Sequence, residues 1–533
     1  MNALGLTFFV GLLLILPAVL AAKRIPAAFP GSPPPLRWLL AAVPLCAAIL
    51  TLLTWVSVLR SPWDDWNGAR TAPAVAWARG MPRDYPHGVG PATDFIHGPM
   101  AAVMRLPAAW ASTPTGAIII ADAINAALFY LPVVLFVLQL GASGFLKGVA
   151  LVIFWAFSFG TGSLIYSAYQ VHADAPAVGL ALLGCVFASR LAGARPGWWP
   201  VVLAALCAVL STASKQNLAP ILAVLPVYVF FRNGWRQAAT LAALELLLGV
   251  LVAGVCVRAF GSDAMVFQMF TLPSRHPWHF QEYGRLQALL VISGYLVQDA
   301  ALPAGVLVFF ALVSSIRPKV RGSGPAPRLV DQAWFLPLLT ALLLVPSALI
   351  GRAKEGGAAN ALTPATYFLV VALVAWIADF RLRDGEAWTD WSSRLVLGST
   401  SLMCVMLTLV CLNPWPKLID NYHEIADLGH NPQQVAYEFS LKHSNAAYFP
   451  WNPLSTLMAD GKYYHFEYGI GDYYLAGDIP PPEQIRAQLP SAMAYLIYPP
   501  KRQSEAMRGL LGAFSARRES PELPPGWIVY TRP

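Results

Sequence analysis

Long apolar stretches separated by short polar segments recur along the first 412 residues of the chain. An α-helix needs about 20 mostly apolar residues to cross the hydrocarbon core of a membrane, and most of these stretches approach or exceed that length. The pattern therefore predicts an α-helical polytopic membrane protein with about twelve transmembrane helices. The expected spans are residues 3–22, 38–59, 116–140, 148–166, 175–192, 198–213, 218–231, 238–257, 286–316, 334–350, 364–378 and 395–412.

Two of these stretches allow more than one interpretation. Residues 286–316 contain Pro303, so they form either one kinked span or a surface helix followed by a span. Residues 3–22 end in small residues, as a signal peptide does, but they have no basic segment before them, and Lys23 and Arg24 follow. We therefore expect a retained first span whose N-terminus lies outside.

The pattern changes after residue 412, where polar and aromatic residues replace the long apolar stretches. Residues 494–498 and 527–530 have the composition of short strands. The chain is thus expected to divide into a transmembrane domain, residues 1–412, and a small soluble α/β domain, residues 413–533.

Composition excludes a soluble protein, because 57% of the residues are hydrophobic and only 12% are charged. The formal charge of +8 does not indicate a nucleic-acid partner, since the cations are dispersed through the loops between apolar stretches. With the N-terminus outside, these loops face the cytoplasm, as the positive-inside rule requires. They include the loops that contain Lys147, Arg232, Arg317, Arg381 and Arg394.

The same orientation places nearly all candidate chemical residues on the outer side. We therefore expect a bacterial inner-membrane protein whose site and C-terminal domain are both extracytoplasmic. The stretches expected outside are residues 60–115, 167–174, 214–217, 258–285 and 351–363.

The six cysteines lie inside apolar stretches, which is typical of small buried side chains and not of disulfides or zinc ligands.

Two adjacent carboxylates, Asp64 and Asp65, lie just beyond the second span. Close carboxylates near a membrane surface repel each other, which raises one pKa and can supply a general base; they can also hold a cation. A solvated loop start explains them equally well if they are considered alone.

The loop that follows resembles the first periplasmic loop of the GT-C superfamily of membrane glycosyltransferases. Members carry an acidic pair just after an early transmembrane helix, then an amphipathic helix, then a glycine- and aromatic-rich stretch that often ends in His/Gly-Pro. One departure is the additional N-terminal span. The matching elements here are Asp64 with Asp65, residues 66–79, residues 80–90, and the run His97, Gly98, Pro99.

Three later segments are also similar to segments of that superfamily. His172 and Asp174 precede Pro176 as in the second acidic turn, and Lys215 with Gln216 matches a pair found in lipid-donor branches. The third is a glycine-rich outer loop that contains Arg352, Lys354, Gly356, Gly357 and Asn360.

The resemblance implies transfer of a monosaccharide from a polyprenyl-phosphate donor to a glycan, lipid or protein acceptor, with inversion at the anomeric carbon. Asp64 would accept the proton of the acceptor hydroxyl and Asp65 would assist it. The sequence identifies no cofactor with certainty; His172 and Asp174 allow a divalent cation, but two ligands do not define a metal site. The donor and its phosphate would be held by Lys215, Gln216, Arg352, Lys354, Asn360, Arg275 and His276.

Two other functions fit the same pattern. A transporter or flippase for a lipid-linked glycan would use the outer charges to bind cargo without breaking a bond. A non-catalytic envelope assembly protein would use the tail as its interaction module. Formation of a glycosylated product separates the enzyme from both.

Overall fold

The fold is taken from a computed structural model of the 533-residue chain. It describes residues 3–28, 33–81, 85, 88–93, 96–191, 197–279, 284–316, 328–380, 391–413, 415–500, 502, 514, 516–518 and 520–531. The basic positions Arg317 and Arg381 lie outside the described residues.

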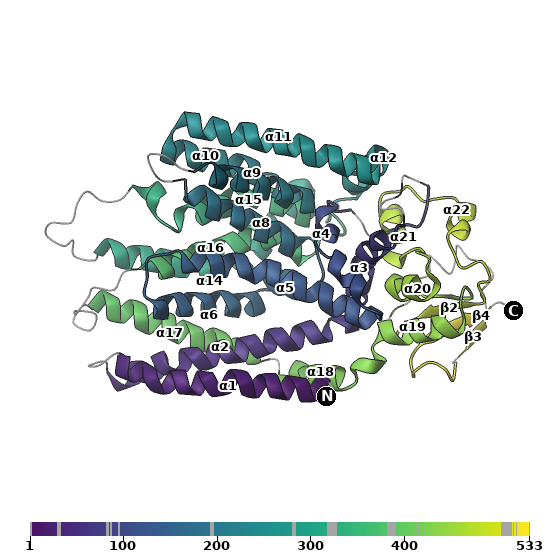
Figure 1. Cartoon of the computed structure of the whole chain (residues 1–533), viewed down its shortest axis with the longest axis horizontal. Coiled ribbons are helices and arrows are strands. Elements are labelled where there is room, and N and C mark those ends of the chain that lie inside the picture. The colour runs from purple at the N-terminus through teal and green to yellow at the C-terminus, as the bar shows by residue number, and fades with distance from the viewer. Residues whose placement is uncertain are drawn as a thin grey trace.

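Apolar helices form a bundle at every expected span (Figure 1). Eight of the described helices are long and apolar enough to cross a membrane, and a bent pair would make a ninth. The others, α8, α9 and α10, are shorter apolar helices within the bundle. The multi-pass helical fold is thereby confirmed. The bundle helices are α1 (Ala3–Ala28), α2 (Pro34–Arg60), α5 (Pro114–Leu138), α6 (Gly144–Gly160), α7 (Gly162–Tyr169), α8 (Asp174–Ser189), α9 (Trp198–Ser214), α10 (Ile221–Asn233), α11 (Trp235–Phe260), α14 (Arg285–Ile316), α15 (Phe335–Ala353), α16 (Thr363–Asp379) and α17 (Trp391–Leu412).

The expected span at residues 148–166 is not a single straight helix. The chain breaks between α6 and α7 and turns by 96°. Thr161 has an extended backbone and lies between Gly160 and Gly162, two residues with low helix propensity. The turned α7 carries Tyr166 and brings Gln170, just beyond its end, to one end of the bundle. By contrast, α14 is one continuous helix with Pro303 inside it, so the surface-helix alternative does not apply.

One end of the bundle is capped by short helices and by the C-terminal region (Figure 1). The N-terminus of α1 also lies at this end. The amphipathic helix α18 (Trp415–Ala426) packs beside α1 and α2 and leads into the C-terminal region. The short elements are η1 (Ser61–Trp63), α3 (Asp65–Ala78), α4 (Met100–Val103), η2 (Leu106–Trp110), η3 (Gln216–Leu218), α12 (Ser262–Val266), the π-helical turn η4 (Phe267–Thr271), α13 (Leu272–Arg275) and η7 (Ala359–Leu362); η6 (Leu329–Asp331) precedes α15 at the opposite end.

The C-terminal region contains a small four-stranded sheet in the order β1-β2-β4-β3. β1 is parallel to β2, and the other pairs are antiparallel. Side chains alternate across β2: Ile497 packs with Phe439 of the covering helix α19, whereas Leu496 packs with Phe466 toward the bundle. The two strand-like segments are confirmed as β2 and β4. The elements are η8 (Leu428–His430), α19 (Pro432–Lys442), β1 (Ala447–Tyr448), α20 (Pro453–Asp460), α21 (Glu467–Leu475), α22 (Pro482–Ala487), β2 (Tyr495–Tyr498), β3 (Ala516–Arg518) and β4 (Ile528–Thr531).

Two basic residues lie at the end of the bundle opposite to the capped end. Arg232 donates to the carbonyl of Ser189 at the end of α8, and Lys147 donates to Leu138 at the end of α5. These helix ends lie opposite to the capped end, where α8 begins at Asp174. All six cysteines are free, and five are buried. Their burial agrees with the interpretation of the cysteines as small buried side chains.

Candidate functional site

A cavity of about 730 Å³ lies at the capped end, between the helix ends of the bundle and α21 of the C-terminal region. Elements far apart in sequence meet there: the loop before α4, the turn before α8, the end of α9, α13 and the loop after α15. The cavity is lined by six of the residues to which the sequence analysis assigned a role in donor binding or in the second acidic turn. They are His172, Lys215, Gln216, His276, Lys354 and Asn360.

Asp174 does not line this cavity itself, but its side chain contacts three residues of one wall. Its side chain is fully buried, and its Oδ1 lies 2.5 Å from Lys215 Nζ. Asn360 Nδ2 donates to Oδ2 at 2.8 Å, and His172 Nδ1 contacts the same oxygen. Burial lowers the pKa of Lys215, and the neighbouring Asp174 opposes that shift. A buried charge needs such partners, so Asp174 fixes three lining residues in place.

Two histidines continue this network toward the cavity. His97 Nε2 lies 3.3 Å from His172 Nε2, and both rings line the cavity. Burial lowers the pKa of His172 to about 3 and the pKa of His97 well below its ordinary value, so both are neutral at pH 7. Arg105 donates to the backbone carbonyl of His172 and to Asn125, which secures the turn from the other side.

Glycines permit the close approach of two loops. A Cβ on Gly98 would lie 1.8 Å from the carbonyl oxygen of Ala213, next to the end of α9. Gly356 has a φ of +84°, and a Cβ on Gly357 would lie 2.3 Å from the carbonyl of Gly351. Only glycine fits these positions without a backbone shift. The His97-Gly98-Pro99 run and the glycine-rich loop are therefore both shaped by backbone packing.

The predicted cations do not all face the cavity. Lys354 lines it, and its Nζ also donates to the carbonyl of Ser274 at 2.7 Å. Arg352 instead donates to the carbonyl of Gly357 at 2.6 Å, and Arg275 pairs with Asp478 at 2.5 Å. Arg352 and Arg275 thus brace the loops around the cavity, while Lys215 and Lys354 lie in its wall.

The C-terminal region supplies part of the wall. Tyr468 and Asp472 of α21 line the cavity, and the Tyr468 ring packs edge-on against Trp66 with centroids 4.4 Å apart. His276 lies 3.8 Å from Asp472, and burial lowers the pKa of His276. Tail aromatics thus divide between core packing, as for Phe466, and this cavity.

Asp64 and Asp65 line a second cavity of about 470 Å³ beside the first. Asp64 caps α3: its Oδ1 accepts from the Trp66 backbone N–H at 2.9 Å, and its Oδ2 accepts from Gln170 Nε2 at 3.0 Å. Asp65 is buried and pairs with Arg502 at 3.1 Å. Burial raises the pKa of Asp65 to about 6, although Arg502 lowers it in part.

A pair of side chains that the sequence did not reveal stands between the two cavities. Tyr166 lines both, and Arg70 donates to its hydroxyl at 2.9 Å. The Arg70 guanidinium also lies 4.8 Å from the centroid of the Trp66 ring. Arg70 shares the helix that follows the acidic pair, but Tyr166 arrives only through the bend before α7. A pattern based on straight spans could not place it.

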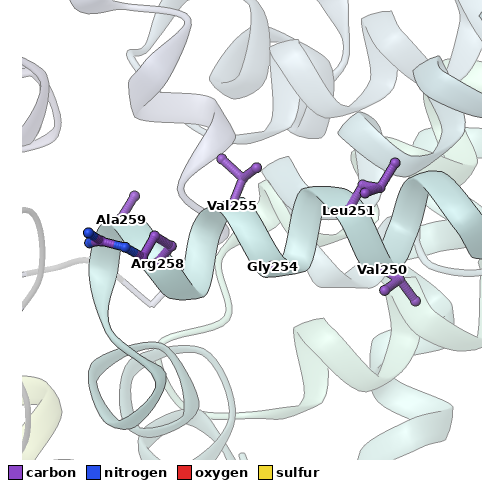
Figure 2. Close-up of a pocket in the computed structure, with 6 residues that line it drawn as sticks. All are labelled: Val250, Leu251, Gly254, Val255, Arg258 and Ala259. Carbon is purple, nitrogen blue, oxygen red and sulfur yellow. The ribbon is translucent and has the colours of Figure 1, made fainter.

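A third hollow, of about 650 Å³, lies on the outer face of α11 (Figure 2). Exposed apolar side chains form it, and Arg258 is its one charged lining residue. A membrane-spanning helix presents such a surface to lipid. Among the described residues, no group of three or more His, Cys, Asp or Glu side chains is placed to hold a metal ion.

Comparison with known proteins supports the fold. No protein-family model matches the chain, and no curated protein sequence matches it. Among solved structures, ArnT from Cupriavidus metallidurans bound to undecaprenyl phosphate is 10% identical, with a TM-score of 0.52 over 91% of this chain and 97% of that one. ArnT in the apo state gives a TM-score of 0.53 at 10% identity, over 92% and 98% of the two chains.

The chain therefore has the fold of a multi-pass integral membrane protein of the kind represented by these two structures. More particularly, its arrangement is that of ArnT over nearly the whole length of both chains. The fold expected from the resemblance is confirmed.

Proposed function

We propose that the protein is a membrane glycosyltransferase that transfers a monosaccharide from a polyprenyl-phosphate donor to an acceptor hydroxyl, with inversion. One observation carries the proposal: a cavity that contains two lysines adjoins a smaller cavity that contains an acidic pair, and one tyrosine lines both. The solved structure of ArnT, which shares this fold, holds undecaprenyl phosphate. A donor with a hydrocarbon tail and a charged sugar-phosphate head fits a cavity at the end of membrane helices.

In this mechanism, Asp64 accepts the proton of the acceptor hydroxyl. The acceptor oxygen forms its bond to the anomeric carbon from the face opposite to the phosphate. The bond between that carbon and the phosphate oxygen breaks, and the polyprenyl phosphate leaves with the electron pair. Lys215 and Lys354 stabilise the charge that develops on this oxygen, with Gln216 and Asn360 as polar partners of the donor.

Asp65 assists Asp64 through charge and position. Because its pKa is raised to about 6, a fraction of Asp65 stays protonated under mildly acidic conditions, which lowers the repulsion between the two carboxyl groups. Tyr166 lines both cavities and accepts a hydrogen bond from Arg70, so its side chain lies where the proposed donor and acceptor sites meet.

We further propose that the capped end faces outward from a bacterial inner membrane. The basic helix ends with Arg232 and Lys147 lie at the opposite end, which would then face the cytoplasm. The donor therefore binds on the extracytoplasmic side, and the residues after 412 form an extracytoplasmic domain that closes the site.

Incubation of the purified protein in lipid nanodiscs with a panel of radiolabelled polyprenyl-phosphate monosaccharides and a glycolipid extract tests this function. We expect one donor to yield a labelled product together with an equal amount of free polyprenyl phosphate. Binding of every donor without cleavage would contradict the proposal and favour a transporter.

A further inference from the structure

The charges of the Asp64 cavity are largely paired with each other. Arg60 Nε lies 2.7 Å from Glu424, and Arg502 Nε lies 3.1 Å from Asp65. These are the two cations that line the cavity within the described residues. An anionic group entering the cavity would have to break one of these ion pairs and approach the carboxylate of Asp64. The cavity therefore favours a neutral ligand.

Two residues that line the cavity have a buried oxygen without a hydrogen-bond partner among the described residues: Asp65, through Oδ1, and Gln170. Gln170 Nε2 donates to Asp64 Oδ2, whereas Gln170 Oε1 is buried and has no hydrogen-bond partner among the described residues. An ionised carboxylate only accepts hydrogen bonds, so the amide nitrogen must face Asp64 and the amide oxygen must point elsewhere. A buried carbonyl oxygen without a donor is unfavourable, and a ligand hydroxyl relieves that cost.

The position of Gln170 is fixed by its neighbours. It follows α7, and the backbone N–H of Val171 donates to Asn67 at 2.8 Å. Asn67 in turn donates to the carbonyl of Ser61, so the chain at Gln170 is tied to the loop that carries the acidic pair. This rigid support holds the amide oxygen ready for a ligand.

We propose that this cavity binds the acceptor as a neutral carbohydrate or polyol, and that Gln170 recognises a hydroxyl next to the one that is glycosylated. The inference rests on the proposed function, because it assigns the acceptor of the same reaction. Trp63 and Tyr166 line the same cavity and supply aromatic surface for a sugar ring.

The test uses octyl glycosides as acceptors in nanodiscs, with the donor that supports transfer. The wild-type protein is assayed with a neutral octyl glycoside, with its monodeoxy derivatives and with its phosphorylated derivative. Gln170→Ala is assayed with the same acceptors. Gln139→Ala serves as the matched control, since Gln139 pairs with Arg190 at the opposite end of the bundle.

We expect one deoxy position to raise the acceptor KM of the wild type about tenfold, because a polar site discriminates against a ligand that lacks its partner group. Gln170→Ala should raise the KM of the parent acceptor by a similar factor and should no longer distinguish the deoxy compound. The donor KM should stay within about twofold, and Gln139→Ala should behave as the wild type.

Equal losses on parent and deoxy acceptors would show that Gln170 has only a structural role and would overturn the proposal. Preference of the wild type for the phosphorylated acceptor would also overturn it, and this comparison stands even if Gln170→Ala does not fold. Transfer to the glycolipid extract but to no octyl glycoside would refute the acceptor assignment alone. No transfer to any acceptor would refute the glycosyltransferase function itself.

Discussion

Asp174 holds a buried charge that depends on a single lysine. Lys215 is its cationic partner, and both side chains are at least nine-tenths buried. Removal of one member of a buried ion pair leaves the other uncompensated, which costs about 3–5 kcal/mol, whereas removal of both costs less. Lys215 therefore has a structural role in addition to its proposed contact with the donor.

Lys215→Met should lower the apparent unfolding temperature in detergent strongly. The double variant Asp174→Asn/Lys215→Met should unfold at a higher temperature than Lys215→Met alone, because no charge is then left without a partner. Lys147→Met, which removes a partly exposed lysine at the other end of the bundle, is the control. Equal unfolding temperatures for Lys215→Met and the control would contradict the buried pair.

The raised pKa of Asp65 should make the stability of the protein depend on pH. Its pKa is raised by burial from 3.8 to about 6, so between these values the folded state binds more protons than the unfolded state. Stability should therefore fall as the pH rises from about 4 to about 6 and should level off above that range. Asp65→Asn lacks this contribution. The unfolding temperature of the variant minus that of the wild type should therefore increase as the pH rises from about 4 to about 6. A constant difference between pH 4 and pH 7 would contradict the assignment.

The sequence revealed the charged residues of the site better than their orientation. The resemblance to the superfamily selected Asp64, Lys215, Gln216, Lys354 and Asn360, and each of them lines one of the two cavities. The sequence could not show that Arg275 and Arg352 bond to the surrounding loops, since those bonds depend on where distant segments meet. Gln170 was missed for the same reason.

At the scale of elements, hydrophobicity located the helices well, because apolar stretches of sufficient length have few alternatives in a membrane. It did not show the 96° bend at Thr161, which follows from two flanking glycines and repositions α7. The strands β1 and β3 also escaped prediction, since two and three residues carry no periodic signal. The bend matters most, because it brings Tyr166 and Gln170 into the site.

The contact between the loop before α4 and the end of α9 predicts a position-specific effect. Gly98→Ala places a Cβ against the backbone of Ala213, so it should displace His97 and Lys215 and destabilise the protein by about 1–3 kcal/mol. Gly249 lies in α11, and a Cβ added there would have no neighbouring atom within 4 Å. Gly249→Ala should therefore leave stability unchanged or raise it by about 0.5–1 kcal/mol. Thermal unfolding of both variants measures the contrast. Similar stability in the two would show that the loop does not pack as described.

At the scale of the whole molecule, the C-terminal region lies at one end of the helix bundle (Figure 1). Residues of this end also line both cavities. The helix α11 joins the two ends, since it begins near Arg232 and ends at Phe260, which packs on Trp77 of α3. The distribution of basic residues indicates which end of the bundle faces outward, and this orientation can be measured by labelling.

Arg236→Cys and Ser262→Cys place exposed thiols at the two ends of α11. In intact spheroplasts, an impermeant maleimide should label Ser262→Cys and should label Arg236→Cys only after lysis, because the capped end is proposed to face outward. The wild type, whose cysteines are mostly buried, gives the background. The reverse labelling pattern would place the site in the cytoplasm.

The most direct test of the account is the transfer rate of Asp64→Asn. The substitution keeps an oxygen that can accept from Trp66 but removes the base, so transfer should fall by at least about a hundredfold while the affinity for the lipid-linked donor stays within about twofold. Asp65→Asn should retain residual turnover. Wild-type transfer by Asp64→Asn, with normal folding and donor binding, would contradict the central claim that Asp64 activates the acceptor.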